Sequence, residues 1–197
     1  MTQVAMIRHG PTAWNEARRI QGRRDEPLSA AGRDEVAAWR VPADIAAFDW
    51  VASPLVRAVE TARLIGAPAP LATDPRLVEM DWGTWEGHTL ADLRQRFGAA
   101  AEANEARGLD FRPDGGESPR EVQARVGDWL AEVAAAGRAT LAVVHKGIIR
   151  ATYARATGWD MMTKPREKMT WAAVHLFDLD ADGTPRVAQL NIPLVGP

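Results

Sequence analysis

The stretch Val4-Ala5-Met6-Ile7-Arg8-His9-Gly10 decides the fold of this 197-residue chain. Its apolar residues form a short run that ends at a cation, an imidazole and a glycine. This pattern is typical of a buried strand whose last residues enter a loop. In open α/β sheets, ligands bind at the carboxyl ends of the strands. We therefore expect a binding site directly after this strand, where Pro11 to Asn15 add a hydroxyl and an amide.

Three later segments carry groups that complement the first. One offers Arg57 after a second apolar strand, Trp50-Val51-Ala52. Another, Leu77 to Gly87, offers the carboxylate of Glu79. The third, Leu141 to Arg150, repeats the first design, because an apolar run leads to a histidine, a lysine and a glycine and then to a helix. Cations, imidazoles and a carboxylate together indicate a site for an anion with several oxygens.

These four anchors, in this order, resemble the histidine phosphatase superfamily, also called phosphoglycerate mutase-like, in its short-chain branch. The resemblance runs from Val4 to Arg150. It also includes Gln21-Gly22, the helix entry Leu28 to Gly32 and Gly115-Gly116-Glu117-Ser118. A chance match to one short motif is common, whereas a chance match to all of them in order is not.

Alternating strand and helix signals favour an α/β fold, a three-layer α/β/α sandwich around a mostly parallel sheet. The polar, helical segment Thr89 to Pro113 indicates a small helical cap insertion, at about 86–117, within a single domain 1–197. We expect helices over Leu28–Trp39, Pro54–Ile65, Ser118–Gly137 and Gly147–Thr157. We expect strands over Val4–Ile7, Trp50–Ala52, Thr140–Val144, Thr170–Asp178 and Val187–Ile192.

Composition narrows the class of protein. The chain has no cysteine, which excludes disulfides, thiolate metal sites and cysteine nucleophiles. Its net charge of −2 gives no general attraction to nucleic acid or to an anionic membrane. The N-terminus has no signal-peptide pattern, and no stretch approaches the roughly 20 apolar residues of a membrane span. We expect a cytoplasmic protein with no nucleic-acid or membrane partner, and we leave open a homodimer through an edge strand near Val187 to Ile192.

The four histidines are His9, His88, His145 and His175, and none has a neighbouring His, Asp or Glu in recognised metal-ligand spacing. We therefore expect no metal and no cofactor. His88 and His175 match no family motif. We interpret His88 as a surface or rim residue and His175 as a strand residue.

The resemblance implies a phosphohistidine mechanism for hydrolysis of a phosphomonoester. In it, His9 attacks phosphorus, and a backbone carbonyl near Gly10 fixes its tautomer. Arg8 and Arg57 grip the phosphoryl oxygens with paired hydrogen bonds. His145 donates to the same oxygens, and Glu79 protonates the leaving oxygen before it deprotonates the attacking water.

Two of these assignments have structural alternatives. Arg57 could form a surface ion pair with Glu60, one helical turn away. Glu79 could be an exposed loop carboxylate, with Asp81 or Glu86 in its place. Only the family motifs favour the functional readings.

A second group of residues is predicted to bind phosphate or to line the same rim. It comprises Thr12, Asn15, Gln21, Gly22 and Lys146. Each of the first four could equally be a turn residue that hydrogen-bonds to its own backbone. Lys146 departs from the family, which often has two glycines after the second histidine. A lysine there can still supply a backbone N–H provided that φ is not positive, and its ammonium could strengthen phosphate binding, reach the other end of the substrate or point into solvent.

The cap suggests the size of the substrate. Its arginines are balanced by acids between Thr89 and Asp114, which favours a single phosphate on a modest organic group over a polyphosphorylated ligand. Trp82, Trp85, Phe97 and Phe111 could supply apolar walls or simply pack the cap.

Other functions remain open. The main alternative is a cofactor-dependent phosphoglycerate mutase, for which the chain looks short. A non-catalytic phosphate-ligand binding protein and an enzyme acting on phosphoproteins rank below it.

Overall fold

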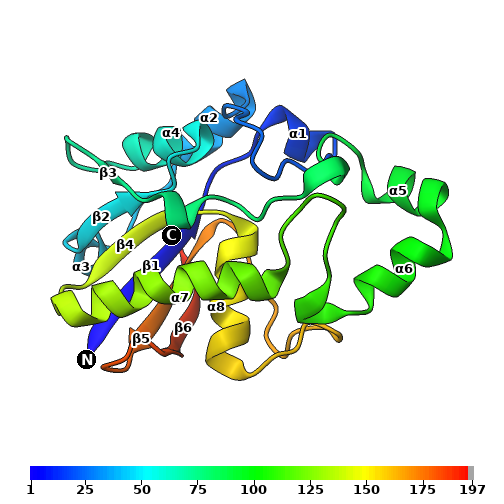
Figure 1. Ribbon diagram of the computed structural model, residues 1–197. Helices are drawn as coiled ribbons and strands as arrows, with labels where there is room; N and C mark the ends of the chain where they lie inside the picture. The colour runs from blue at the N-terminus through cyan, green and yellow to red at the C-terminus, as the bar shows by residue number, and fades with distance from the viewer. Residues whose placement is uncertain (195–197) are drawn as a thin grey trace.

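A six-stranded sheet forms the centre of the molecule in the computed structural model, which describes residues 1–194 (Figure 1). The strand order is β3-β2-β4-β1-β5-β6. The three pairings among β3, β2, β4 and β1 are parallel, whereas β5 is antiparallel to both of its neighbours. The strands are β1 (Thr2–Arg8), β2 (Asp49–Ala52), β3 (Ala72–Thr73), β4 (Thr140–Val144), β5 (Ala173–Leu179) and β6 (Pro185–Pro193).

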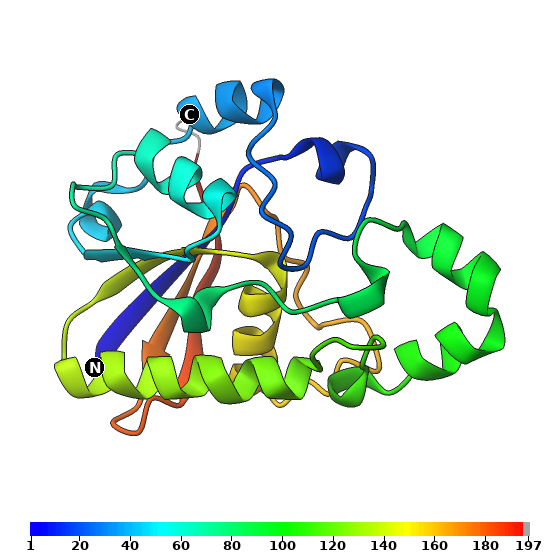
Figure 2. The same ribbon diagram turned by 45° about the horizontal axis from the view of Figure 1, so that its top comes forward.

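Helices cover both faces of the sheet, which confirms the predicted three-layer α/β/α sandwich (Figure 2). The helices are α1 (Ala13–Glu16), α2 (Ala30–Ala37), α3 (Ala43–Ala46), α4 (Val56–Leu64), α5 (Leu90–Phe97), α6 (Ala99–Glu105), α7 (Pro119–Ala136) and α8 (Lys146–Thr157). None of the helices within residues 1–194 combines the length and the apolar character that crossing a bilayer requires.

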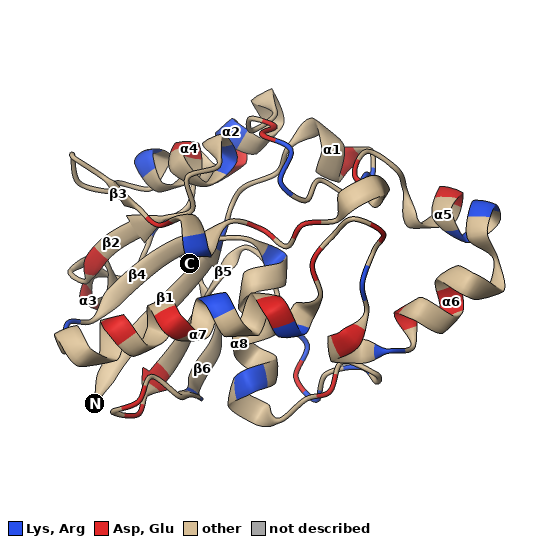
Figure 3. Cartoon of the chain, in the orientation of Figure 1, with Lys and Arg blue, Asp and Glu red and all other residues tan. Residues whose placement is uncertain are grey.

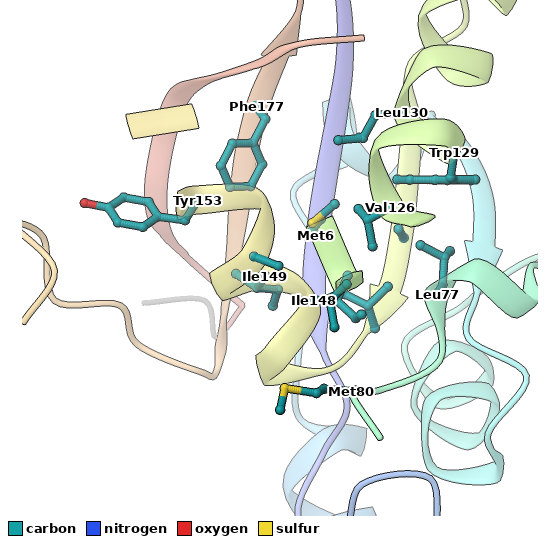
Figure 4. Close-up of a cluster of buried hydrophobic side chains, with 14 of the residues drawn as sticks. Met6, Leu77, Met80, Val126, Trp129, Leu130, Ile148, Ile149, Tyr153 and Phe177 are labelled. Atoms are coloured by element: carbon teal, nitrogen blue, oxygen red, sulfur yellow. The ribbon is translucent and has the colours of Figure 1, made fainter. Parts of the chain in front are cut away.

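The alternation of side chains along β1 explains the two packed layers. Val4 and Met6 belong to a buried cluster with residues of α7 and α8, whereas Ala5 and Ile7 belong to a second cluster with residues of α2 and α3. Because successive side chains of a strand point to opposite faces, one fully buried strand can serve both layers. Figure 4 shows Met6 among side chains of α7 and α8 in the larger cluster.

Several element boundaries differ from the predicted ones for local reasons. The helix expected from Leu28 begins at Ala30, because Ser29 caps it by accepting from the N–H of Gly32. The helix expected from Pro54 begins at Val56. The strand expected from Thr170 begins at Ala173, because Thr170 is held by the side chain of Asn191. Helix α8 begins at Lys146, one residue earlier than expected.

Helices α5 and α6 project beyond one edge of the layered body (Figure 1). A capping box between Thr89 and Asp92 starts α5, and Leu93 is its one buried residue. Helix α6 buries only Ala101. These two helices therefore bury few residues of their own.

Candidate active site

The site lies where β1 and β4 end. These strands are parallel neighbours, with Arg8 paired to Val144, so their next residues, His9 and His145, emerge side by side. The two imidazole rings are 5.1 Å apart, centre to centre, at an angle of 57°. A cavity of about 520 Å³ opens at this edge of the sheet, and its lining includes Arg8, His9, Arg57, Glu79 and Lys146.

His9 has one fixed tautomer. Its Nδ1 lies 2.7 Å from the carbonyl oxygen of Gly10, and because a carbonyl only accepts, Nδ1 must carry the proton. The opposite nitrogen, Nε2, therefore has a free lone pair. Burial lowers the pKa of His9 well below 6.5, and the charges of Arg8 and Arg57 lower it further. The ring is consequently neutral and nucleophilic near neutral pH.

This arrangement requires a glycine at position 10, because a β-carbon there would collide with the side chain of Val36. Its N–H donates to the hydroxyl of Thr61 at 2.9 Å, and that hydroxyl donates to the carbonyl of Arg57 at 2.7 Å. The loop that orients His9 is thus tied directly to helix α4.

His145 is fully buried and is held by Ser53, whose Oγ lies 2.7 Å from Nε2. When the serine hydroxyl donates to Nε2, the ring proton resides on Nδ1, which has no partner within residues 1–194. Burial, then Arg57, lowers the pKa of His145 well below 6.5. His145 does not line the cavity itself, so it lies beside His9 rather than on the cavity surface.

Arg57 is buried and does not form the surface ion pair considered above; Glu60 pairs with Arg33 instead. Its two terminal nitrogens donate to the carbonyls of Arg24 and Gly22, at 2.6 and 2.8 Å. Its Nε has no partner in the described part of the chain, and the same holds for Nε of Arg8. Each guanidinium therefore keeps a buried donor for an oxyanion.

The carboxylate of Glu79 lines the cavity and accepts two backbone N–H groups. They are those of Met80 at 2.8 Å and of Gly147, in the first turn of α8, at 3.1 Å. A β-carbon at position 147 would collide with this carboxylate. Asp81 and Glu86, the alternative candidates for the role of Glu79, do not line the cavity. The carboxylate of Asp81 accepts the N–H of Gly83, and the carboxylate of Glu86 accepts the N–H of Arg23.

A network behind Glu79 was not anticipated from the sequence. Arg125 and Arg23 both donate to the carbonyl oxygen of Glu79, at 3.3 and 3.5 Å. The carboxylate of Glu117 binds both arginines. Glu117 lies in the Gly115–Ser118 motif, which was the only sequence signal for it.

The second group of predicted residues contains four that line the cavity and one, Thr12, that does not. Asn15, Gln21, Gly22 and Lys146 line the cavity. Thr12 does not; it is fully buried, and its hydroxyl caps α1 by accepting the N–H of Asn15 at 3.2 Å. The φ angle at Lys146 is not positive, so the lysine occupies the first turn of α8 without strain.

Three further cations line the cavity, namely Arg18, Arg19 and Arg150. The cavity is therefore more basic than the cap sequence predicted, because these residues lie outside the cap. Within the cap, α5 carries both acidic and basic residues whereas α6 carries only acidic ones (Figure 3), and Arg94 of α5 pairs with Glu105 of α6 at 2.5 Å.

Aromatic rings form the apolar wall. Trp82, Trp85 and Phe111 line the cavity and pack on one another with ring centres 5.3–6.2 Å apart. Phe97 instead lines a separate hollow on the cap. His88 is exposed and His175 is buried in β5, as expected. Within residues 1–194, no cluster of three or more His, Cys, Asp or Glu side chains could hold a metal ion.

Comparison with known proteins gives this geometry a family. The sequence profile of the histidine phosphatase superfamily (branch 1) matches residues 4–193. The chain belongs to this superfamily. The resemblance found in the four anchors is thereby confirmed, and the match extends beyond Arg150 into the two C-terminal strands.

Proteins with different names are similar to this chain. A probable phosphoglycerate mutase GpmB of Proteus mirabilis is 38% identical over 64% of this chain, and the match spans only 60% of that relative's length. A glucosyl-3-phosphoglycerate phosphatase of Mycolicibacterium vanbaalenii is 34% identical, over 79% of this chain and 74% of its own. The structure of a mycobacterial glucosyl-3-phosphoglycerate phosphatase in complex with VO3 superimposes with a TM-score of 0.77 at 27% identity, over the whole of both chains.

Proposed function

We propose that this histidine phosphatase is a metal-independent phosphomonoesterase that hydrolyses a small-molecule phosphate ester through a phosphohistidine on His9. The observation that carries the proposal is the orientation of His9. Its Nδ1 donates to Gly10, which leaves a neutral Nε2 beside the unpaired donors of Arg8 and Arg57. A nucleophile and oxyanion donors thus converge on one cavity.

In the first step, Nε2 of His9 forms a bond to phosphorus as the bond from phosphorus to the ester oxygen breaks. Arg8 and Arg57, which line the cavity, stabilise the phosphoryl oxygens. His145, whose ring centre lies 5.1 Å from that of His9, is proposed to donate its N–H to them from beside the nucleophile. The leaving oxygen takes a proton from Glu79, whose carboxyl faces the cavity. The alcohol leaves, and the phosphoryl group remains on His9.

In the second step, the carboxylate of Glu79 removes a proton from water. The water oxygen attacks phosphorus, the nitrogen–phosphorus bond breaks, and inorganic phosphate leaves. Neutral His9 and protonated Glu79 are restored. Asn15, Gln21, Gly22 and Lys146 are proposed to bind the phosphate or its rim from the same cavity.

The similarity to a glucosyl-3-phosphoglycerate phosphatase supports hydrolysis of a small phosphate ester. The similarity to a probable phosphoglycerate mutase supports the second candidate, in which the phosphoryl group returns to the product. The two activities share the phosphohistidine and differ in whether water reaches it.

The test is release of inorganic phosphate from a panel of phosphomonoesters in the presence of EDTA. We expect turnover by the wild type and none by His9→Ala. His88→Ala is the matched control, because this histidine is exposed and does not line the cavity. Wild-type enzyme quenched during turnover should carry an acid-labile, alkali-stable phosphoryl group.

Turnover by His9→Ala equal to that of the wild type would overturn the proposal. Interconversion of phosphoglycerates that depends on a bisphosphorylated primer, without phosphate release, would establish the mutase instead. Binding of phosphate esters without either reaction would indicate a non-catalytic binding protein.

Several other expectations stay predictions. They are a single domain with its cap at about 86–117, a cytoplasmic location, a small-molecule substrate without nucleic-acid or membrane partners, and a homodimer through β6. The position of β6 at the edge of the sheet supports the last of these.

A further inference from the structure

The two arginines proposed to bind the phosphoryl oxygens are held in different ways. Both terminal nitrogens of Arg57 donate to loop carbonyls, so part of its set of N–H donors is occupied. Within residues 1–194, the side chain of Arg8 forms no hydrogen bond and no ion pair, and its Nε is buried without a partner. The direction of the Arg8 guanidinium is therefore set by a contact of another kind.

The indole ring of Trp171 supplies that contact. Cζ of Arg8 lies 5.6 Å from the ring centre, within the roughly 6 Å over which an aromatic ring attracts a cation. Burial lowers the pKa of Arg8, and a desolvated cation is attracted to a ring more strongly than an exposed one. A guanidinium that stacks on a ring keeps the N–H donors in its plane free for the oxygens of a ligand.

Two strands fix the chain directly before the ring. The carbonyl oxygen of Thr170 lies 3.0 Å from Nε2 of His175, which donates to it because a carbonyl only accepts. The side chain of Asn191 accepts both the N–H and the hydroxyl of Thr170, at 2.7 and 3.0 Å. The ring of His175 is buried in β5, and its centre lies 6.3 Å from that of Trp171. Residues of β5 and β6 thus hold the backbone that carries the indole.

Trp171 acts on the site through the cations that it contacts. Arg8 and Lys146 both line the cavity, whereas Trp171 does not. Nζ of Lys146 lies 5.3 Å from the same ring centre, so one indole contacts two cations. Met6 of β1 is paired with His175 of β5, which places the anchor of Trp171 on the strand next to the one that delivers Arg8.

We propose that Trp171 is a positioning residue whose ring holds the guanidinium of Arg8 toward the phosphoryl oxygens, a task that loop carbonyls perform for Arg57. The inference rests on the proposed function, because that function assigns Arg8 to the phosphoryl group. Hydrogen bonds to the protein would occupy donors of Arg8, whereas stacking on Trp171 leaves all of them for the oxyanion. Lys146 contacts the same ring, so the test separates the two cations.

The test is a double-mutant cycle between Trp171 and Arg8, measured as the dissociation constant of orthovanadate in calorimetric titrations. Orthovanadate stands in for the phosphoryl group and binds without turnover. Trp171→Leu should weaken binding roughly five- to tenfold, as expected for the loss of a cation–π contact. In the Arg8→Gln background the same substitution should change binding less than about twofold, because the group that the ring holds is gone.

Rescue and control variants separate positioning from a general effect on the connection between α8 and β5. Trp171→Phe should keep binding within about threefold of the wild type, since phenylalanine also presents a ring face to a cation. Trp171→Met, a second substitution without a ring, should behave like Trp171→Leu. Trp159→Leu is the matched control, because Trp159 lies in the same connection and contacts Arg150 instead, with Cζ 5.0 Å from its ring centre. Its effect should be the same in the wild type and in Arg8→Gln, and a circular dichroism spectrum shows that each variant is folded.

Three results would overturn the inference. Equal weakening by Trp171→Leu in the wild type and in Arg8→Gln would show that the ring acts on the backbone around it and not on Arg8. Loss of the effect in Lys146→Gln but not in Arg8→Gln would assign the ring to the lysine. Absence of vanadate binding to the wild type would remove the oxyanion site and the inference with it.

The inference and the proposed function fail in different ways. Hydrolysis of phosphate esters without coupling between Trp171 and Arg8 would leave the proposed function standing and remove the positioning role. Coupling in a protein that releases no phosphate and forms no phosphohistidine would leave the positioning role standing and remove the proposed function.

Discussion

Ser53 orients the imidazole ring of His145. The serine is fully buried, and its Oγ lies 2.7 Å from Nε2 of His145. A hydroxyl that donates to Nε2 forces the proton onto Nδ1, where it can serve a phosphoryl oxygen. Orientation of a histidine by one partner is a general requirement of such sites.

Ser53→Ala should therefore lower kcat by about ten- to a hundredfold with a smaller change in KM, since a donor to the transition state loses its orientation. Steady-state kinetics on the best ester of the panel measures this. Thr140→Ala is the control, because Thr140 is a buried hydroxyl at the opposite end of β4 that binds only the carbonyl of Arg138. A loss of kcat in the control as large as in Ser53→Ala would contradict the orienting role.

The buried histidines also predict a pH dependence. Folding lowers the pKa of His9 and His145 below 6.5, so in acid the unfolded chain binds protons that the folded chain does not. Their contribution to the free energy of unfolding is present above about pH 6.5 and is lost as the pH falls towards the folded pKa values, by at most about 1.4 kcal/mol per pH unit for each histidine.

Urea unfolding at pH 7.5, 6.5 and 5.5 measures this loss, and His145→Gln should flatten the slope. The same shift keeps His9 neutral in mild acid. The acidic limb of kcat/KM should accordingly lie below pH 6.5 rather than at it. A limb above that value would show that His9 is not the group that must be neutral.

At this scale, the sequence identified the residues that stand in short motifs. His9, Arg57 and Glu79 each follow an apolar run or lie in a recognisable tripeptide, and the structure places all of them at one cavity. Ser53, Trp171 and Arg150 were missed because their roles depend on contacts across the fold. Thr12 has two possible roles in the sequence, because a hydroxyl that caps a helix cannot be told from one that binds a ligand until the helix is seen; in the structure it caps α1.

At the scale of elements, charged side chains connect the loop from Glu79 to Gly83 with the start of α7. Glu117, directly before the Ser118 cap of α7, binds Arg23 and Arg125, and both arginines donate to the carbonyl of Glu79. Glu79, the proposed general acid, is thus held through its backbone carbonyl by two charged side chains. The ion pair of Glu117 with Arg125, at 2.8 Å, has the short distance of a charge-assisted hydrogen bond.

Glu117→Gln should loosen the loop and reduce kcat roughly tenfold, equivalent to about 1.4 kcal/mol of transition-state stabilisation. Glu132→Gln is the matched control, because Glu132 on α7 pairs with Arg76 but is exposed and does not line the cavity. Equal effects of the two variants on kcat would show that Glu117 forms a structural ion pair and does not position Glu79.

The type and order of most elements could be predicted, but their ends and the shortest of them could not. Strong periodicity marked α7, and the Ser118-to-Glu121 capping box fixed its start. The edge strand β3, with two residues, and the four-residue helix α3 carry too little pattern to be recognised. Three-dimensional contacts, such as that of Thr170 with Asn191, set the remaining boundaries.

The whole molecule carries a net charge of −2, yet its cavity is lined by six cations and two acids, namely Arg8, Arg18, Arg19, Arg57, Lys146 and Arg150 with Glu79 and Glu105. Overall composition therefore conceals a strongly positive interior surface. A negative exterior with a positive cleft favours small anions over large polyanions, which meet the unfavourable outer charge first.

Orthovanadate should raise the melting temperature more than inorganic phosphate at equal concentration, because it can adopt the five-coordinate geometry of the transition state. At about a hundredfold excess over its dissociation constant, the shift should be roughly 5–10 °C. Differential scanning fluorimetry measures it, with chloride at matched ionic strength as reference. Arg63→Gln, an exposed change on α4, should keep the shift, whereas His9→Ala should lose the advantage of vanadate over phosphate.

The pairing of β1 with β4 has a consequence for how the protein matures. The two histidines lie far apart in the sequence, at positions 9 and 145, and meet only when these strands lie in register. No growing chain still lacking β4, and no proteolytic fragment without it, can assemble the pair. The rate at which turnover returns after dilution from denaturant would therefore measure the rate at which β1 and β4 pair during refolding.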